Sequence, residues 1–225
     1  MPKKFNRVKG FYFAPLQEMK LHKKRYYRIA GELYPSVTTV LSAQKNDRLD
    51  AWRDSVGHDV ANYIARTAAN RGKIFHSAIE TYLNNKDTSI YKNNVLAYAL
   101  FSLIKEKVEL IDNVCGLEIP LYSKKYKIAG RADCVADFNG IASVIDFKSA
   151  TREKTDDIAE KHAIQETAYA IMFEEQTQIP IKQVVTLVAC ENGQTQVIIE
   201  KTENHIEKLE KCIEEFRAQE EQIEK

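Results

Sequence analysis

The dipeptide Asn139-Gly140 constrains this chain more than any other feature, because it joins two runs in which apolar and polar residues alternate. These runs span residues 132–138 and 141–148. Asn-Gly between two such runs predicts a type I′ turn and a β-hairpin. The turn also fixes the register in which the two strands pair.

Counting outward from the turn places Asp133 opposite Asp146 and Arg131 opposite Lys148. Side chains alternate between the two faces of a strand, so these four residues share one face. The residues expected on the opposite, core-facing side are Ala132, Cys134, Ile145 and Phe147. Like charges that face one another destabilise a sheet by up to about 1 kcal/mol. We therefore expect a cation to compensate the two aspartates.

The aspartates offer hard oxygen ligands, which favour one or two Mg²⁺ or Mn²⁺ ions. Such ions keep positions open for water and phosphate oxygens, so a phosphodiester fits as substrate. Arg131 and the cations should lower the pKa of Lys148, which then orients or deprotonates the attacking water. Arg131 itself is expected to stabilise charge on the phosphate. The alternative is an ordinary amphipathic hairpin whose charged groups pair in solvent.

The hydrophobic periodicity divides the chain into three parts of one structural unit. Residues 1–35 form a basic arm with a short hairpin at Arg25–Tyr34, residues 36–112 a helical portion, and residues 113–225 a sheet-rich core. This predicts an α/β fold. Within the core we expect a helix at 156–177, strands at 183–189 and 194–200, and a final helix.

Composition narrows the class of protein. The net charge is +1, yet the first 31 residues carry nine Lys or Arg against the single acid Glu18, which suits a polyanion or a solvated terminus equally well. No apolar run approaches the roughly 18 residues of a membrane span, and no secretory signal is evident, so we expect a soluble intracellular protein with no membrane partner. Four dispersed cysteines predict reduced thiols.

Several motifs together resemble one family, the RecB-type branch of the PD-(D/E)XK nucleases. The matching segments are Gly130-Arg131-Ala132-Asp133 for G-x-x-D, Asp146-Phe147-Lys148 for D/E-x-K, and Gln165-Glu166-Thr167-Ala168-Tyr169 for Q-x-x-x-Y. Residues 72–80 are similar to the first motif of that branch, in which a helix supplies a histidine ligand. Residues 35–41 and the overall spacing resemble, more loosely, phage exonucleases and the mitochondrial genome maintenance exonuclease group.

The resemblance implies a restriction-endonuclease-like core, a small mixed sheet flanked by helices, with the N-terminal helical portion arching over the site. It implies a set of metal ligands, namely His76, Asp133, Asp146 and the carbonyl of Phe147. Lys148 would be the catalytic lysine. Gln165 and Tyr169, four residues apart on one helix face, would brace it or contact DNA. Ala132 replaces the proline of the name-giving motif, and the cysteines of the iron-sulfur members are missing.

The expected activity is Mg²⁺- or Mn²⁺-dependent hydrolysis of DNA, exonucleolytic on single strands or exposed ends. A structure-specific endonuclease, a non-catalytic DNA-binding recombination module and a binder of another polyanion are the alternatives. The resemblance further implies recombination or replication proteins as partners, and a bacterial, phage-infected or organellar compartment.

Other candidates have two interpretations each. His76 is either a ligand or a packed core histidine, and Glu80 either an oxygen ligand or a solvent-facing acid; Glu118 is a weaker ligand candidate. Trp52 and Tyr63 would stack on bases or, as we favour, anchor a helical layer. Ser36, Thr38 and Thr39 would hold a phosphate at a helix N-terminus, although plain capping explains Ser36 equally well. His22, His58, His162 and His205 receive no role.

Overall fold

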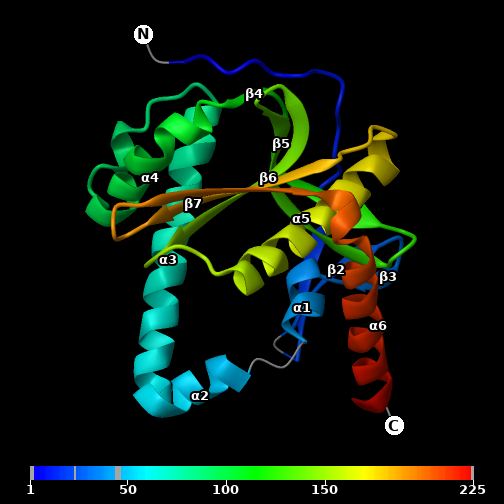
Figure 1. The fold of residues 1–225 in the computed structure, drawn as a ribbon. Helices are drawn as coiled ribbons and strands as arrows, with labels where there is room; N and C mark the ends of the chain where they lie inside the picture. Colours follow the sequence, from blue (N-terminus) through cyan, green and yellow to red (C-terminus); the bar gives the residue numbers. More distant parts are fainter. Residues whose placement is uncertain (1–2, 23, 44–46, 224–225) are drawn as a thin grey trace.

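The computed structural model describes residues 3–22, 24–43 and 47–223, arranged around a five-stranded sheet (Figure 1). Its strands, in spatial order, are β4 (Ile111–Ser123), β5 (Ile128–Phe138), β6 (Ile141–Ala150), β7 (Gln183–Cys190) and β8 (Thr195–Lys201). Strands β6 and β7 are parallel, whereas the other neighbouring pairs are antiparallel. The expected mixed sheet in an α/β fold is confirmed.

Helices pack on both faces of this sheet (Figure 1). One face is covered by α3 (His58–Leu83) and α4 (Val95–Val108), the other by α5 (Asp156–Thr177) with α1 (Val37–Ser42) and α6 (Ile206–Ile223). Helix α5 has the predicted bounds and connects the parallel strands β6 and β7, a connection that needs a crossover of this kind. The remaining helices of the described residues are α2 (Asp47–Val56), η1 (Ser89–Tyr91) and η2 (Thr202–Asn204).

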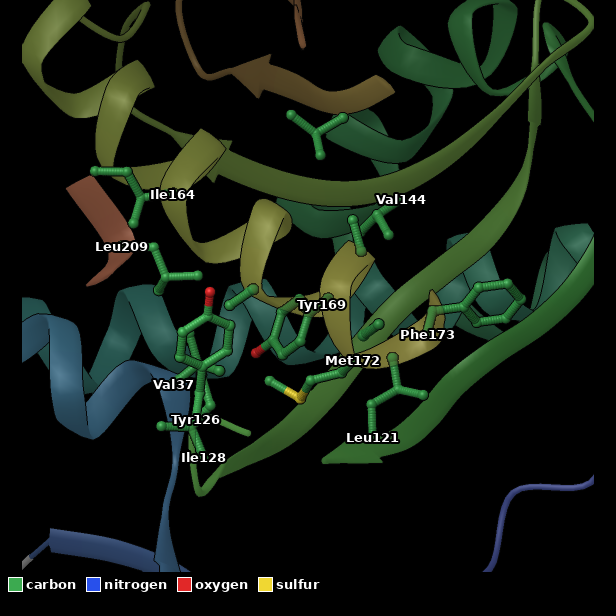
Figure 2. Packing of buried hydrophobic residues seen from close by; sticks show 14 of the residues in the cluster. Val37, Leu121, Tyr126, Ile128, Val144, Ile164, Tyr169, Met172, Phe173 and Leu209 are labelled. Atoms are coloured by element: carbon green, nitrogen blue, oxygen red, sulfur yellow. The ribbon is translucent and has the colours of Figure 1, made fainter. Parts of the chain in front are cut away.

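Two apolar clusters hold these layers together. In the first, shown in Figure 2, Tyr169, Met172 and Phe173 of α5 pack against Leu121 of β4 and Val144 of β6. Burial of side chains of this size stabilises the fold by about 1.5–3 kcal/mol each. The second cluster joins α3 and α4 to the opposite face, so side chains on both faces of the hairpin are buried.

An antiparallel sheet of three strands precedes the helices, formed by β1 (Gln17–Leu21), β2 (Lys24–Ile29) and β3 (Glu32–Pro35). The expected hairpin is β2–β3, and β1 extends it. This sheet contacts the main one where Ser36 bridges to Ala129, and Tyr27 packs against the same alanine. It therefore lies beside the start of β5.

Helix α2 and the first half of α3 extend away from the sheet (Figure 1). Trp52 is 37% exposed and Tyr63 is 61% exposed. The favoured expectation that these aromatics anchor a helical layer is wrong, because the sheet reaches neither α2, which carries Trp52, nor the part of α3 that carries Tyr63. Within residues 3–22, 24–43 and 47–223, no helix combines the length and apolar composition needed to cross a membrane.

Candidate functional site

The hairpin register is confirmed near the turn and ends before the charged residues. Asn139 and Gly140 have φ values of 51° and 78°, both positive as a type I′ turn requires, and pairing runs from Phe138–Ile141 to Cys134–Ile145. The expected pairs Asp133–Asp146 and Arg131–Lys148 are not formed. Beyond Cys134, β5 stays with β4 while β6 continues beside β7, so the two strands separate.

We call this separation the fork; it comprises residues 128–133 of β5 and 146–150 of β6. Arg131 pairs with Pro120 of β4 instead of Lys148, and its side chain is exposed. Asp133 still reaches across the fork, since its Oδ2 accepts a hydrogen bond of 3.1 Å from the backbone N–H of Phe147. The two aspartates thus belong to one cluster without being a cross-strand pair.

Helix α3 brings His76 to the fork. Its Nδ1 lies 3.3 Å from Asp133 Oδ2, and its ring meets that of Phe147 edge to face. Its α3 neighbours Phe75 and Ile79 are fully buried against the sheet, which fixes the orientation of the helix. The histidine therefore faces the carboxylates rather than the core, as a ligand would.

Lys148 and Gln165 both contact Asp146, which is 3% exposed. Lys148 Nζ lies 2.5 Å from Asp146 Oδ2, and Gln165 Nε2 donates to Oδ1 at 3.4 Å. The structure does not show the expected lowering of the Lys148 pKa: burial lowers that pKa, but Asp146, Asp133 and Glu166 together raise it by more. Arg131, named as a cause of the lowering, is not paired with the lysine.

Tyr169 packs directly on the glycine of the G-x-x-D segment. A Cβ on Gly130 would lie 2.7 Å from Tyr169 Cε1, closer than two carbons can approach. The tyrosine is 4% exposed, and its pKa is raised by burial and by the charges of Asp133 and Asp146. It is thus placed as a buried support of the fork, not as a surface residue for contacting DNA.

Glu118, the weaker ligand candidate of the sequence analysis, lies close to the other candidates in the structure. The pairs Leu117–Cys134 and Ile119–Ala132 place it opposite Asp133. Its φ of 50° is rare for a residue other than glycine inside a strand. Ligand atoms of Glu118, His76 and Asp133 lie within 4.8 Å of one another. The signal was the β4–β5 register, a long-range pairing that no local pattern reveals.

The cluster has the electrostatics and donors of a cation site. Burial and the charge of Asp146 raise the pKa of Asp133 to about 7. Asp146 Oδ2 is buried and, although close to Lys148, has no hydrogen bond of good geometry. Carboxylate oxygens and an imidazole nitrogen suit Mg²⁺ or Mn²⁺. The side chains of His76, Glu118 and Asp133 therefore fit a divalent metal, whereas Asp146, expected as a ligand, is paired with Lys148 and lies outside this group of atoms in the structure.

A cavity of about 520 Å³ opens beside this cluster. Its wall includes Glu80, one helical turn after His76, and two cations, Lys73 and Arg131. Arg131 Nε lies 4.0 Å from Glu118 Oε2. The cavity joins the candidate ligands to basic side chains that suit a phosphate.

Three residues proposed to bind substrate lie away from the fork in the structure or have contacts within the protein: Ser36, Thr38 and Trp52. Ser36 accepts from the backbone N–H of Thr39, which makes it the N-cap of α1, and Thr38 accepts from the guanidinium of Arg25. Trp52 lies on the exposed helix α2. The capping interpretation of Ser36 is confirmed.

His162, to which the sequence assigned no role, lies on α5 near the catalytic candidates. Burial and the charge of Lys148 lower its pKa to about 4, so the ring is neutral at pH 7. Its Nε2 is buried without a hydrogen-bond partner among the described residues. A histidine inside a helix without a partner motif gives no sequence signal of this position.

Some basic side chains of the N-terminal segment form hydrogen bonds or ion pairs with other parts of the protein. Lys3 Nζ donates to the carbonyls of Glu109 and Ile111, and Lys24 lies 2.5 Å from Glu220 of α6. These contacts reduce the charge that the segment has free for a polyanion. Arg28 on β2 remains exposed.

Comparison with known proteins gives both a family and two relatives. The sequence profile of the PD-(D/E)XK nuclease superfamily matches residues 95–225. Mitochondrial genome maintenance exonuclease 1 of Homo sapiens is 27% identical over 129 residues, covering 53% of this chain and 38% of that protein. The Mus musculus protein of that name is 26% identical over 128 residues, with the same coverage. The matched part thus spans well under half of the length of these relatives. The family match begins at residue 95, so it does not include His76.

Proposed function

Since this chain belongs to the PD-(D/E)XK nuclease superfamily, we propose that it is a divalent-metal-dependent nuclease that hydrolyses phosphodiester bonds of DNA. We further propose that it acts as an exonuclease on single strands or exposed ends. The names of the two relatives, which contain the words genome maintenance and exonuclease, support the substrate and the mode. The resemblance to RecB-type enzymes favours recombination or repair of DNA as the setting.

The observation that carries the proposal is the fork, where Asp133, Asp146 and Lys148 gather beside His76. In the proposed roles, the carboxylates and His76 hold Mg²⁺ or Mn²⁺. The cation supplies positive charge to the phosphate and acidity to the attacking water. Lys148 orients that water or receives its proton, and Gln165 holds Asp146 through its amide.

The proposal predicts that Asp146→Asn and Lys148→Met each lower the rate of metal-dependent DNA cleavage by about 10²–10⁴-fold. The matched control is Asp137→Asn, an acid on the paired half of the same hairpin whose carboxylate accepts from Asn113. It should cleave at the wild-type rate. Full activity of both fork variants, or equal loss in the control, would contradict the proposed function.

The substrate and mode need their own comparison, with end-labelled single-stranded DNA, double-stranded DNA, RNA and a covalently closed circle tested side by side in Mg²⁺ and in Mn²⁺. We expect stepwise release of nucleotides from linear DNA and no cleavage of the circle. A cut circle would make the protein an endonuclease. Salt-sensitive binding without cleavage, unchanged in the fork variants, would leave only a polyanion-binding module.

A further inference from the structure

Helix α5 carries an acid that is almost completely buried. Glu166 is 1% exposed and follows Gln165, among buried neighbours that include Ile164 and Ala168. A buried carboxyl group costs several kcal/mol unless other groups compensate it, and an apolar residue of similar volume is often more stable. The fold alone therefore does not account for an acid at this position.

The contacts of Glu166 lead to the fork. The hydroxyl of Thr186 donates to Glu166 Oε1 at 2.5 Å, and Thr186 is itself 1% exposed. Thr186 is the β7 partner of Asp146 in the parallel ladder. The carboxyl group of Glu166 thus lies against the part of the sheet that carries Asp146. Burial and the charge of Asp146 raise the pKa of Glu166, so its carboxylate form is disfavoured while Asp146 carries no cation.

Lys148 needs an anionic partner if it is to keep one position during the reaction. In this structure its ion pair is with Asp146, at 2.5 Å. The proposed function requires the oxygens of Asp146 for a cation, which would weaken that pairing. Glu166 is the buried acid that Thr186 holds beside Asp146; it forms no ion pair with Lys148 in this structure, so the ammonium group would turn from Asp146 toward it once a cation is bound.

We propose that Glu166, braced by Thr186, is a positioning residue that holds the ammonium group of Lys148 at the fork while Asp146 binds the cation. The inference rests on the proposed nuclease function. It assigns no direct contact between Glu166 and DNA, because the side chain is buried under α5. Loss of Glu166 should therefore affect turnover and leave substrate binding intact.

The test compares Glu166→Gln, Glu166→Leu and the control Glu174→Gln, an exposed acid on the same helix. We expect kcat for single-stranded DNA to fall about 10- to 100-fold in both Glu166 variants, with KM within about twofold of wild type. The metal-free thermal midpoint of Glu166→Leu should equal or exceed that of wild type. Thr186→Val, which removes the hydroxyl, should lower kcat. Thr186→Ser, which keeps the hydroxyl, should have a kcat close to that of wild type.

A kcat of Glu166→Gln within about twofold of wild type would overturn the inference. So would a loss of kcat that follows a parallel loss of the thermal midpoint in Glu166→Gln and Thr186→Val. If Glu166→Leu fails to fold, the burial argument fails with it, and the Gln variant still decides the role in turnover. An inactive wild-type protein would instead contradict the proposed function, which separates the two failures.

Discussion

The two halves of the β5–β6 hairpin differ in strand pairing, although one turn connects both strands. In the half next to Asn139-Gly140, the strands pair as the turn dictates, up to Cys134 and Ile145. In the fork the same strands separate, and each keeps its other neighbour. The paired half contributes apolar side chains to both clusters, whereas the fork collects carboxylates, a lysine and a histidine.

The difference shows why the candidate site lies where pairing ends. A strand pair uses its N–H and C=O groups within the ladder, which leaves no donor for a side chain. At the fork the N–H of Phe147 is released from β5 and donates to the carboxylate of Asp133. The separation also gives His76 of α3 access to Asp133. Local separation of two strands thus provides the donors and the space that the cluster needs.

Among variants that leave every charged group of the site in place, the largest effect should come from adding one methyl group to the fork. In Gly130→Ala the new Cβ meets Tyr169 Cε1 at 2.7 Å, so the buried ring must move. We expect DNA cleavage to fall about 10- to 100-fold, because the support of the site is displaced. The free energy of unfolding should fall by about 1–3 kcal/mol, as for overpacked cores. Cleavage kinetics and chemical denaturation measure the two effects.

Gly140→Ala is the matched control in the paired half. Gly140 has a φ of 78° and open space around a new Cβ, so alanine there is strained without any clash. The variant should lose about 1–2 kcal/mol of stability and keep its kcat. Equal loss of kcat in both glycine variants would mean that the two halves do not differ as described.

The second prediction concerns pH. The pKa of Asp133 rises from 3.8 to about 7 in the folded protein, since burial and Asp146 disfavour its charged form. Between these values the folded state binds more protons than the unfolded state, so stability falls as pH rises from about 4 to about 7. We expect the thermal midpoint in EDTA to drop by several degrees over this range, and Mg²⁺ or Mn²⁺ to reduce the drop.

Asp133→Asn should flatten this dependence without abolishing it. Burial also raises the pKa of Glu118 and Glu166, and both act with the same sign, whereas the pKa of His162, lowered to about 4, opposes them between about pH 4 and 6.5. A wild-type midpoint that stays constant or increases with pH in EDTA would contradict the assignment, as would an unchanged slope in the Asp133 variant.

The paired half, helix α5 and the mixed sheet were predictable because local signals determine them. Asn139-Gly140 fixes a turn type and a register, and apolar periodicity gives α5 its predicted bounds. Three residues of the candidate cluster were predictable from the sequence. Motif resemblance indicated His76, and the alternation of side chains between the two faces of a strand indicated Asp146 and Lys148. The geometry of the cluster was not predictable, because the register holds only while the two strands remain neighbours, and that depends on where β7 attaches.

Residues positioned by distant segments had a weak sequence signal, as for Glu118, or none, as for Glu166. Glu118 faces Asp133 through the β4–β5 ladder, and Glu166 meets Thr186 across α5 and β7. The exposure of Trp52 was missed for a related reason: an apolar helix face predicts burial only if another layer reaches it, and the sheet ends before α2. Sequence patterns describe an element, whereas exposure depends on its neighbours.

The smallest expected effect should sharpen the comparison at Glu118, which has a left-handed backbone on β4, opposite Asp133 of the fork. A φ of 50° costs a residue other than glycine roughly 1–2 kcal/mol. Glycine avoids this strain but loses more backbone entropy on folding, which costs about 0.5–1 kcal/mol. Glu118→Gly should therefore be about 0.5–1 kcal/mol more stable than wild type without metal. Its affinity for Mn²⁺, measured by calorimetry, should fall about tenfold, because one candidate ligand is removed. Ala30→Gly, with a φ of 49° in the β2–β3 turn, should gain similar stability and bind Mn²⁺ like wild type. Unchanged Mn²⁺ affinity in Glu118→Gly would exclude this side chain from the cation site and restrict the site to His76, Asp133 and Asp146.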